Sequence, residues 1–165
     1  MKKFLTMTMA AMAFVVSMSS CSKDDDEKVV PVAEQVTGSY TGIEVISVMG
    51  EESSNGTSTY EFAKSSDTSV DMTIPSSGEM GHMMIPALPV KGITLSKISE
   101  SITGKVASYA GTVINAAGEE KAYTVSDLVV LFEDVPKGKA VALSFSLKYG
   151  NMPMSMETVF TGDKQ

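Results

Sequence analysis

The stretch from Val141 to Phe160 reads VALSFSLKYGNMPMSMETVF, and its pattern decides the fold class. From Val141 to Tyr149 every second residue is apolar, and the residues between them are small or polar. The same alternation continues in the second half, up to Phe160. A period of two places the apolar side chains on one face of a strand. Gly150 and Asn151, between the halves, predict a tight two-residue hairpin with a positive φ angle at Gly150.

Alternation and turn residues recur upstream, and helical periodicity is hard to find. The apolar phase changes between Ile43/Val45 and Ile46/Val48, which predicts a β-bulge that bends a strand around a barrel. Four consecutive apolar residues, 128–131, predict a strand that is buried on both sides or passes through a bulge. The pattern yields about 8–10 strands, enough for a small closed antiparallel barrel.

Turn residues divide this pattern into segments. We expect a polar turn at residues 50–56, a loop at 75–81, and one long bent strand or two short strands over 82–98, where prolines interrupt the ladder. Pro153 lies early in the last strand, so we expect the first pairing position of that strand to be lost. The fold class is therefore all-β, with one domain over residues 37–165.

The N-terminal stretch has the features of a secretory signal peptide. Two lysines precede a short apolar block from Phe4 to Met18, and small residues follow it. Met18-Ser19-Ser20-Cys21 resembles a bacterial lipobox, which implies cleavage after residue 20 and palmitate-type acyl chains on Cys21. The alternative is an ordinary signal peptide with a chance cysteine. Lipidation accounts better for an unpaired thiol in an exported chain, and more than one acyl chain makes anchoring stable.

An acidic run follows the predicted lipid anchor. It consists of Lys23, Asp24, Asp25, Asp26 and Glu27. One interpretation is a solvated linker kept extended by like charges. The other is an address, because the run looks like the lipoprotein export signal of the Bacteroidota, which implies the outer leaflet of the outer membrane. We assign residues 1–20 to the signal peptide and 21–36 to the anchor cysteine and a flexible tether.

The first and last predicted strands carry short motifs that resemble a known family. The motifs are Gly38-Ser39-Tyr40-Thr41-Gly42 at the start, and Lys148-Tyr149-Gly150-Asn151-Met152-Pro153 with Phe160-Thr161-Gly162 at the end. They resemble the calycin-like β-barrel domain of Bacteroidota lipoproteins, over roughly residues 36–164. The resemblance implies an up-and-down barrel of the calycin and lipocalin type. Lipocalins carry Gly-x-Trp in the first strand, where this chain has Tyr40, and the family implies no particular activity.

Charge and composition argue against several classes of function. Cleavage before Cys21 would remove two of the 13 basic residues and none of the 20 acidic ones, which changes the formal net charge from −7 to −9. An acidic surface without arginine argues against nucleic-acid binding, which depends on phosphate neutralisation. The chain also lacks the short motifs of nucleophilic, phosphate-binding and zinc enzymes. We therefore expect a non-catalytic protein without a cofactor.

Methionines near the single histidine offer one alternative. Met80, His82, Met83 and Met84 lie together in the sequence, and thioether and imidazole groups can hold Cu(I). Met152, Met154 and Met156 could add sulfur from one strand face. Core packing explains that series more simply, because methionine fills irregular apolar space, and a Met-lined apolar pocket is a third interpretation. Five tyrosines could stack on sugars, although barrel filling with hydroxyls at the rim is favoured.

We therefore expect a cell-surface lipoprotein of the outer membrane. Its acyl chains on Cys21 would contact the membrane, and its barrel would hold a small apolar ligand or a protein partner. The alternative is a structural or accessory subunit of a surface complex.

Overall fold

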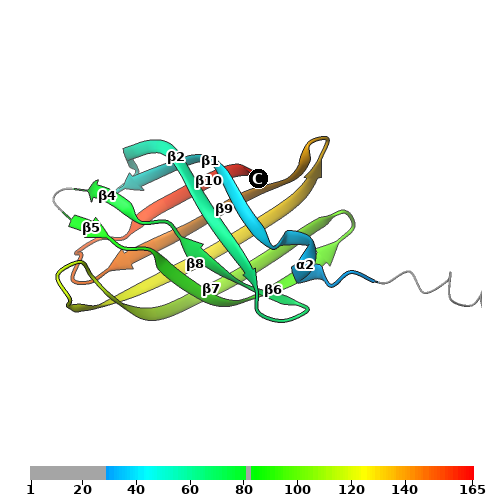
Figure 1. The fold of residues 1–165 in the computed structure, drawn as a ribbon. Helices are drawn as coiled ribbons and strands as arrows, with labels where there is room; N and C mark the ends of the chain where they lie inside the picture. Colours follow the sequence, from blue (N-terminus) through cyan, green and yellow to red (C-terminus); the bar gives the residue numbers. More distant parts are fainter. Residues whose placement is uncertain (1–28, 81–82) are drawn as a thin grey trace, which may run out of the picture. The chain divides into compact units, whose positions relative to one another are not determined.

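The computed structural model describes residues 29–80 and 83–165, and residues 31–165 form one compact unit. This unit is almost entirely β-structure (Figure 1). Its elements in chain order are α2 (Val32–Val36), β1 (Gly38–Val48), β2 (Glu51–Lys64), β3 (Ser69–Ile74), β4 (Ser77–Met80), β5 (Met83–Ile85), β6 (Leu88–Ile98), β7 (Ser101–Ile114), β8 (Glu120–Val135), β9 (Gly138–Tyr149) and β10 (Met156–Lys164).

Eight of these strands close into an antiparallel barrel, in the order β1-β10-β9-β8-β7-β6-β3-β2. Neighbours in the barrel follow one another along the chain, except where β10 returns to β1 and where the separate β4–β5 hairpin interrupts the path from β3 to β6. The expected fold class, an all-β up-and-down barrel of eight to ten strands, is confirmed.

The last two strands pair as their alternation predicts, but their connection is longer than expected. The β9–β10 ladder runs from Leu147↔Met156 to Ala140↔Asp163, and the alternating apolar residues from Val141 to Tyr149, together with Met156 and Phe160, face inward. Gly150 has the expected positive φ of 55°. The prediction of a two-residue hairpin at Gly150-Asn151 is wrong, because residues 150–155 all lie outside the strands. Pro153 has no N–H to donate, and the Gly150 N–H donates to the Ala122 carbonyl on β8 instead.

The tight hairpin lies at Met49-Gly50. Both residues have positive φ angles, 55° and 82°, as a two-residue turn of the I′ type requires. Because β2 begins at Glu51, the polar turn expected at residues 50–56 is wrong after its first residue. The loop expected at residues 75–81 contains β4. Within the described part of residues 82–98 the structure has the three-residue β5 and the eleven-residue β6, and neither one long bent strand nor two short strands.

Both predicted bulges are present. The register of β1 against β2 shifts between Ile46 and Ser47. On β8 the register against β9 shifts between Ser126 and Val129, where Asp127 has a positive φ of 54°. Beyond this second shift Leu128, Val130 and Phe132 face the interior, whereas Val129 is 40% exposed, so the run passes through a bulge and is not buried on both sides.

Aromatic rings fill the end of the barrel next to α2 and its middle. Tyr40, Phe62 and Phe132 form one cluster with ring centroids 5.0–5.6 Å apart. Tyr60 packs with its centroid 4.5 Å from that of Phe160, and its hydroxyl donates to Glu44 Oε2 at 2.5 Å. Edge-on and tilted contacts of this kind add to the stabilisation from area burial. This part of the barrel is a packed core.

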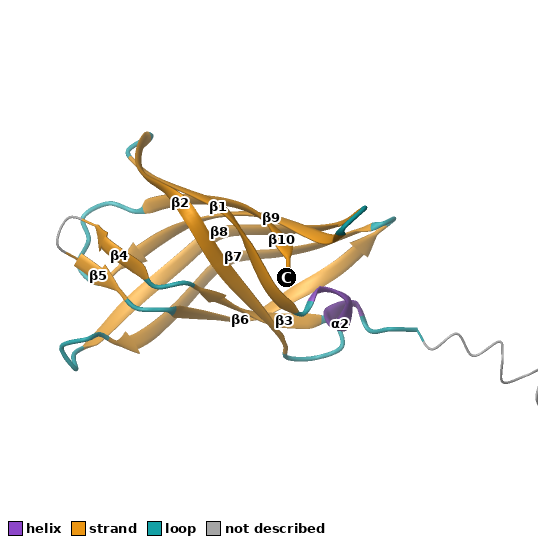
Figure 2. Ribbon diagram, turned by 45° about the horizontal axis from the view of Figure 1, so that its top comes forward, coloured by secondary structure: helices purple, strands orange, loops and turns teal. Residues whose placement is uncertain are grey.

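A short helix covers the filled end of the barrel (Figure 2). Helix α2 lies within the segment that the sequence analysis assigned to the flexible tether, yet Ala33 and Val36 are fully buried. The Ala33 N–H donates to the Asp67 carbonyl at 3.2 Å, and the Tyr40 hydroxyl donates to the Val36 carbonyl at 2.9 Å. Burial of two apolar side chains against the barrel therefore holds five residues that have no strong helical pattern of their own.

Tyr40 gives the barrel a specific sensitivity to alkali. Burial, with a smaller effect of Asp134, raises the pKa of Tyr40 to about 12. In the unfolded chain Tyr40 ionises near the ordinary pKa of 10. The stability that its neutral, buried hydroxyl contributes is therefore complete below pH 10 and is lost between pH 10 and 12.

We expect the free energy of unfolding to fall with pH in this window. In Tyr40→Phe the slope should be shallower by up to about 1.4 kcal/mol per pH unit. Urea unfolding at a series of pH values measures this, and parallel curves for the two proteins would contradict it.

Candidate binding site at the barrel mouth

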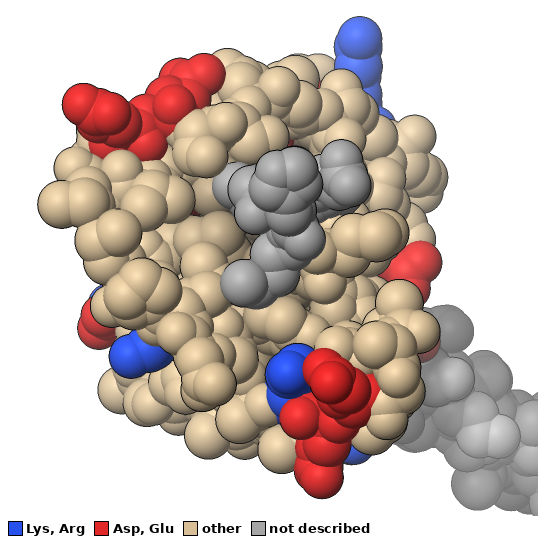
Figure 3. All heavy atoms as spheres, turned by 90° about the vertical axis from the view of Figure 1, so that its left-hand side faces the viewer, with Lys and Arg blue, Asp and Glu red and all other residues tan. Residues whose placement is uncertain are grey.

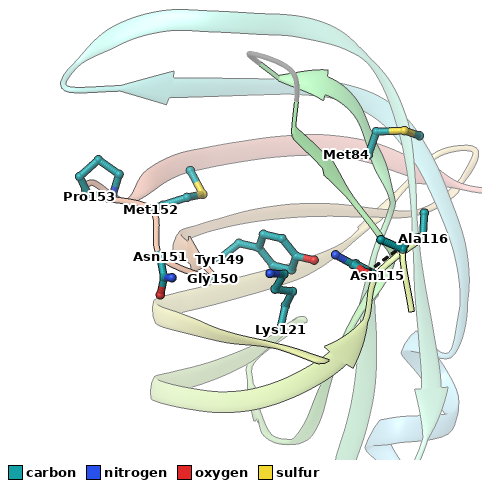
Figure 4. Close-up of a pocket in the computed structure, with 10 residues that line it drawn as sticks. Met84, Asn115, Ala116, Lys121, Tyr149, Gly150, Asn151, Met152 and Pro153 are labelled. Atoms are coloured by element: carbon teal, nitrogen blue, oxygen red, sulfur yellow. Dashed lines mark hydrogen bonds between the residues drawn. The ribbon is translucent and has the colours of Figure 1, made fainter. Parts of the chain in front are cut away.

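The end of the barrel opposite α2, here called the mouth, contains a cavity of about 490 Å³. Three segments meet there: the β4–β5 hairpin, the β7–β8 turn and the β9–β10 connection (Figure 4). Its lining residues are Met84, Asn115, Ala116, Ala117, Lys121, Tyr149, Gly150, Asn151, Met152 and Pro153. The volume lies within the range of small-molecule sites, about 300–1,000 Å³.

Hydrogen bonds fix the turn between β7 and β8. The Asn115 side-chain oxygen accepts the N–H groups of Ala117 at 3.0 Å and Glu119 at 2.9 Å. Gly118 supplies a positive φ of 78°, and its N–H donates to the Asn115 carbonyl. Asparagine is suited to such a turn because its side chain replaces a backbone acceptor. The small side chains of Ala116 and Ala117 are thereby held at the rim of the cavity.

The charged groups at the mouth compensate one another. Lys121 Nζ lies 2.9 Å from Glu119 Oε2, and the Asn115 amide donates to the same oxygen at 3.2 Å. The hydrogen bond to Glu119 raises the pKa of Lys121, and the hydrogen bonds from Lys121 and Asn115 lower the pKa of Glu119. Both groups therefore stay ionised at neutral pH. Lys121 therefore provides a hydrogen-bond donor at the cavity, and its positive charge is balanced by Glu119.

Tyr149 brings a buried hydroxyl to the mouth. Its side chain is the last inward-facing group of β9 and is only 3% exposed. In Figure 4 its hydroxyl points toward the side of the mouth where Asn115 lies. Among the described residues, this oxygen is the one buried side-chain polar atom without a hydrogen-bond partner. Buried polar atoms are nearly always paired, so an exception in the wall of a cavity needs an explanation.

A second tyrosine lies beside Tyr149 on the neighbouring strand. Tyr123 on β8 is directly opposite Tyr149 in the ladder, and its hydroxyl donates to the Pro89 carbonyl on β6. The ring reaches β6 across Gly111 on β7, where an added Cβ would lie 2.5 Å from the ring. Burial, together with the neighbouring Tyr109, raises the pKa of Tyr123 to about 12. Gly111 therefore leaves the space that positions Tyr123.

The methionines of the last segment separate into three environments. Met156 is buried in the core, Met152 is half-buried and lines the cavity, and Met154 is exposed. The single strand face expected for all three is wrong, because β10 begins only at Met156. Met84 also lines the cavity and is 63% exposed. Two methionines thus form apolar walls at the mouth, as the Met-lined pocket interpretation predicts.

Several predicted site residues lie outside the described part of the chain. These are Cys21, Lys23, Asp24, Asp25, Asp26, Glu27 and His82. For Met80 and Met83 the structure describes the backbone, which pairs in the β4–β5 hairpin. Within residues 29–80 and 83–165, no three His, Cys, Asp or Glu side chains gather where they could hold a metal ion. A Cu(I) site at Met80, His82, Met83 and Met84 is therefore untested.

The tyrosines mainly fill the barrel, which is the interpretation that the sequence favoured over sugar stacking. Four are buried in the core: Tyr40, Tyr60, Tyr123 and Tyr149. Sequence reasoning identified Tyr149 only as one member of this set, and it did not single out Lys121 or Asn115. The sequence Ala-Ala-Gly-Glu-Glu at residues 116–120 predicts a turn, but it cannot show that this turn meets the β9–β10 connection.

The surface around the mouth carries charge mainly near its border (Figure 3). Acidic side chains gather there in groups, and most of the remaining face is uncharged. Glu51 belongs to this end, because it pairs with Val48 and Val48 also pairs with Met156. A separate hollow of about 420 Å³ lies on the outer wall, beside Ile43, which is 51% exposed.

No helix in the part of the chain that the structure describes has the length and apolarity to span a membrane.

Comparison with known proteins identifies the fold family. The family model for the calycin-like beta-barrel domain matches residues 36–163, which is most of the chain. The chain belongs to this family. No curated protein matches it. The calycin-like barrel is also similar to a solved structure described as a "putative outer membrane protein" from Bacteroides fragilis, with a TM-score of 0.61 and 17% sequence identity. The match covers 82% of this chain and 53% of that one, so the chain spans about half the length of the solved structure.

We expect any side chain larger than that of glycine at position 111 to destabilise the calycin-like barrel. In Gly111→Ala the new methyl group displaces the Tyr123 ring, and we expect unfolding to become easier by about 1–3 kcal/mol, as in other overpacked cores. Gly56→Ala is the matched control, because a Cβ at Gly56 has open space around it. Urea unfolding of both variants measures the difference. Equal stabilities would show that Gly111 does not provide this space.

Proposed function

We propose that this calycin-like domain is the non-catalytic binding module of a lipid-anchored outer-membrane lipoprotein. Its ligand is a small, mainly apolar molecule that occupies the mouth of the barrel. The observation that carries the proposal is the cavity at the mouth, which has apolar walls and an unpaired buried hydroxyl. Such a cavity, with a few convergent polar groups, is the usual form of a ligand site.

The division of the barrel into a filled and a hollow part supports this location. The aromatic clusters and α2 occupy the other end and the middle, so the cavity lies at the mouth. Met84 and Met152 provide flexible, polarisable walls that adapt to an apolar shape. The charged pair at the mouth is already neutralised, which suits binding better than proton transfer.

The lipid anchor rests on the motif around Cys21. The outer-membrane location agrees with the description of the Bacteroides fragilis protein. In the native host, we expect the mature protein to begin at Cys21 with acyl chains attached, and Cys21→Ser to move from the membrane fraction to the soluble one. Ser22→Ala is the control and should remain in the membrane. Protease treatment of intact cells should cleave the wild-type protein if residues 23–27 direct it to the surface. An unmodified Cys21 in the mass spectrum would refute the anchor.

The ligand site can be tested with an apolar fluorescent probe. We expect pyrene to bind the wild-type barrel, and Ala117→Trp to weaken binding by about tenfold or more, because the large indole fills the mouth. Ala63→Trp is the matched control, since Ala63 is exposed on β2. Titration of pyrene fluorescence measures both affinities. If pyrene does not bind, or if the two variants weaken binding equally, the small-molecule role is wrong. A protein partner, for instance at the outer hollow beside Ile43, then becomes the better hypothesis.

A further inference from the structure

The chemistry of the mouth indicates what kind of apolar molecule fits there. We propose that the ligand carries an uncharged hydrogen-bonding group, a hydroxyl or a carbonyl, which pairs with the Tyr149 hydroxyl while its apolar body lies between Met84 and Met152. This inference rests on the proposed function, because it specifies the ligand of the same cavity.

The argument for a polar group on the ligand comes from a comparison of the buried tyrosines. Tyr40 donates to the Val36 carbonyl, Tyr60 to Glu44, and Tyr123 to the Pro89 carbonyl. The barrel therefore supplies an acceptor for each of these hydroxyls in its core. Tyr149 is equally buried and lines the cavity, yet its hydroxyl has no partner among the described residues. A ligand group at the mouth supplies the missing partner, since an unpaired buried hydroxyl is costly.

The argument for an uncharged group comes from Lys121 and Glu119. The lysine is paired with Glu119 at 2.9 Å, and the Asn115 amide also donates to that carboxylate. An anionic group would have to compete with Glu119 for Lys121, and a cationic group would have to compete with Lys121 and Asn115 for Glu119. Either charge would lose its water in a mainly apolar cavity without gaining a free counter-charge, which is costly. A neutral group avoids this cost.

The argument for the rest of the ligand comes from the walls of the cavity. Met84, Met152 and Pro153 present apolar atoms on the sides formed by the β4–β5 hairpin and the β9–β10 connection, as Figure 4 shows. Ala116 and Ala117 leave the β7–β8 side open. These walls suit an alkyl chain or a flat ring system. The ligand is therefore a neutral amphiphile with a small polar end.

A matched set of ten-carbon probes tests the polar end. The set consists of 1-decanol, 2-decanone, decanoate and decylamine, each used to displace pyrene from the full folded protein. We expect 1-decanol and 2-decanone to bind at least about tenfold more tightly than the two charged probes. In Tyr149→Phe, both neutral probes should bind about fivefold more weakly, which is the loss of one neutral hydrogen bond. Pyrene has no hydrogen-bonding group, so its affinity should not fall. Tyr109→Phe is the control, because Tyr109 does not line the cavity.

A second variant tests the charge argument without altering Tyr149. Glu119→Gln removes the carboxylate and leaves Lys121 uncompensated, so decanoate should bind about tenfold more tightly while 1-decanol stays unchanged. If pyrene binds but Tyr149→Phe affects neither neutral probe, or if decanoate is the tightest ligand of the wild type, the inference is overturned and the proposed function stands. If pyrene itself fails to bind, the proposed function is overturned with it.

Discussion

The structure depends on the pairing of its first barrel strand with its last. The β1–β10 ladder runs from Tyr40↔Lys164 to Val48↔Met156 and joins segments more than a hundred residues apart. Closure removes both edges that the sheet would otherwise expose. Gly42 is opposite Gly162 in this ladder, and a Cβ on Gly42 would lie 2.0 Å from the Thr161 carbonyl oxygen. Without this contact, neither the packed interior nor the mouth would exist.

Closure creates a single interior that the chain uses in two different ways. Near α2 and in the middle, aromatic rings fill the space and every buried tyrosine hydroxyl has an acceptor. At the mouth, the strands end in segments that carry Ala116, Ala117 and Met152, whose side chains do not fill the opening. The packed part stabilises the fold, and this allows the mouth to keep a polar atom that folding alone leaves unpaired.

Membership of the calycin-like family says less about a possible ligand than the side chains at the mouth of the barrel do. The calycin-like barrel is a scaffold, and a scaffold of this kind can hold different ligands or none. The solved Bacteroides fragilis structure is similar in fold at 17% identity, which carries no information about side chains at a site. The features that bear on a ligand are side chains at the mouth of this chain: the unpaired hydroxyl of Tyr149, the ion-paired Lys121, and the methionines Met84 and Met152.

The sequence by itself determined the strands, because inward and outward positions alternate locally and need no knowledge of the partner strand. This is why the Val141–Tyr149 pattern, the two bulges and the positive φ of Gly150 were predictable. The lengths of the turns were less predictable. The sequence pattern predicted a tight hairpin at Gly150, but the two-residue hairpin of the structure lies at Met49-Gly50.

Tertiary structure alone decided α2 and the candidate binding site. The five residues of α2 are helical because Ala33 and Val36 find a barrel end to cover. Tyr149 belongs to the same alternating series as the core residues before it, and nothing in the series shows that its hydroxyl lacks an acceptor. Whether a side chain fills space or borders a cavity depends on residues from distant segments, and those meet only after the barrel has closed.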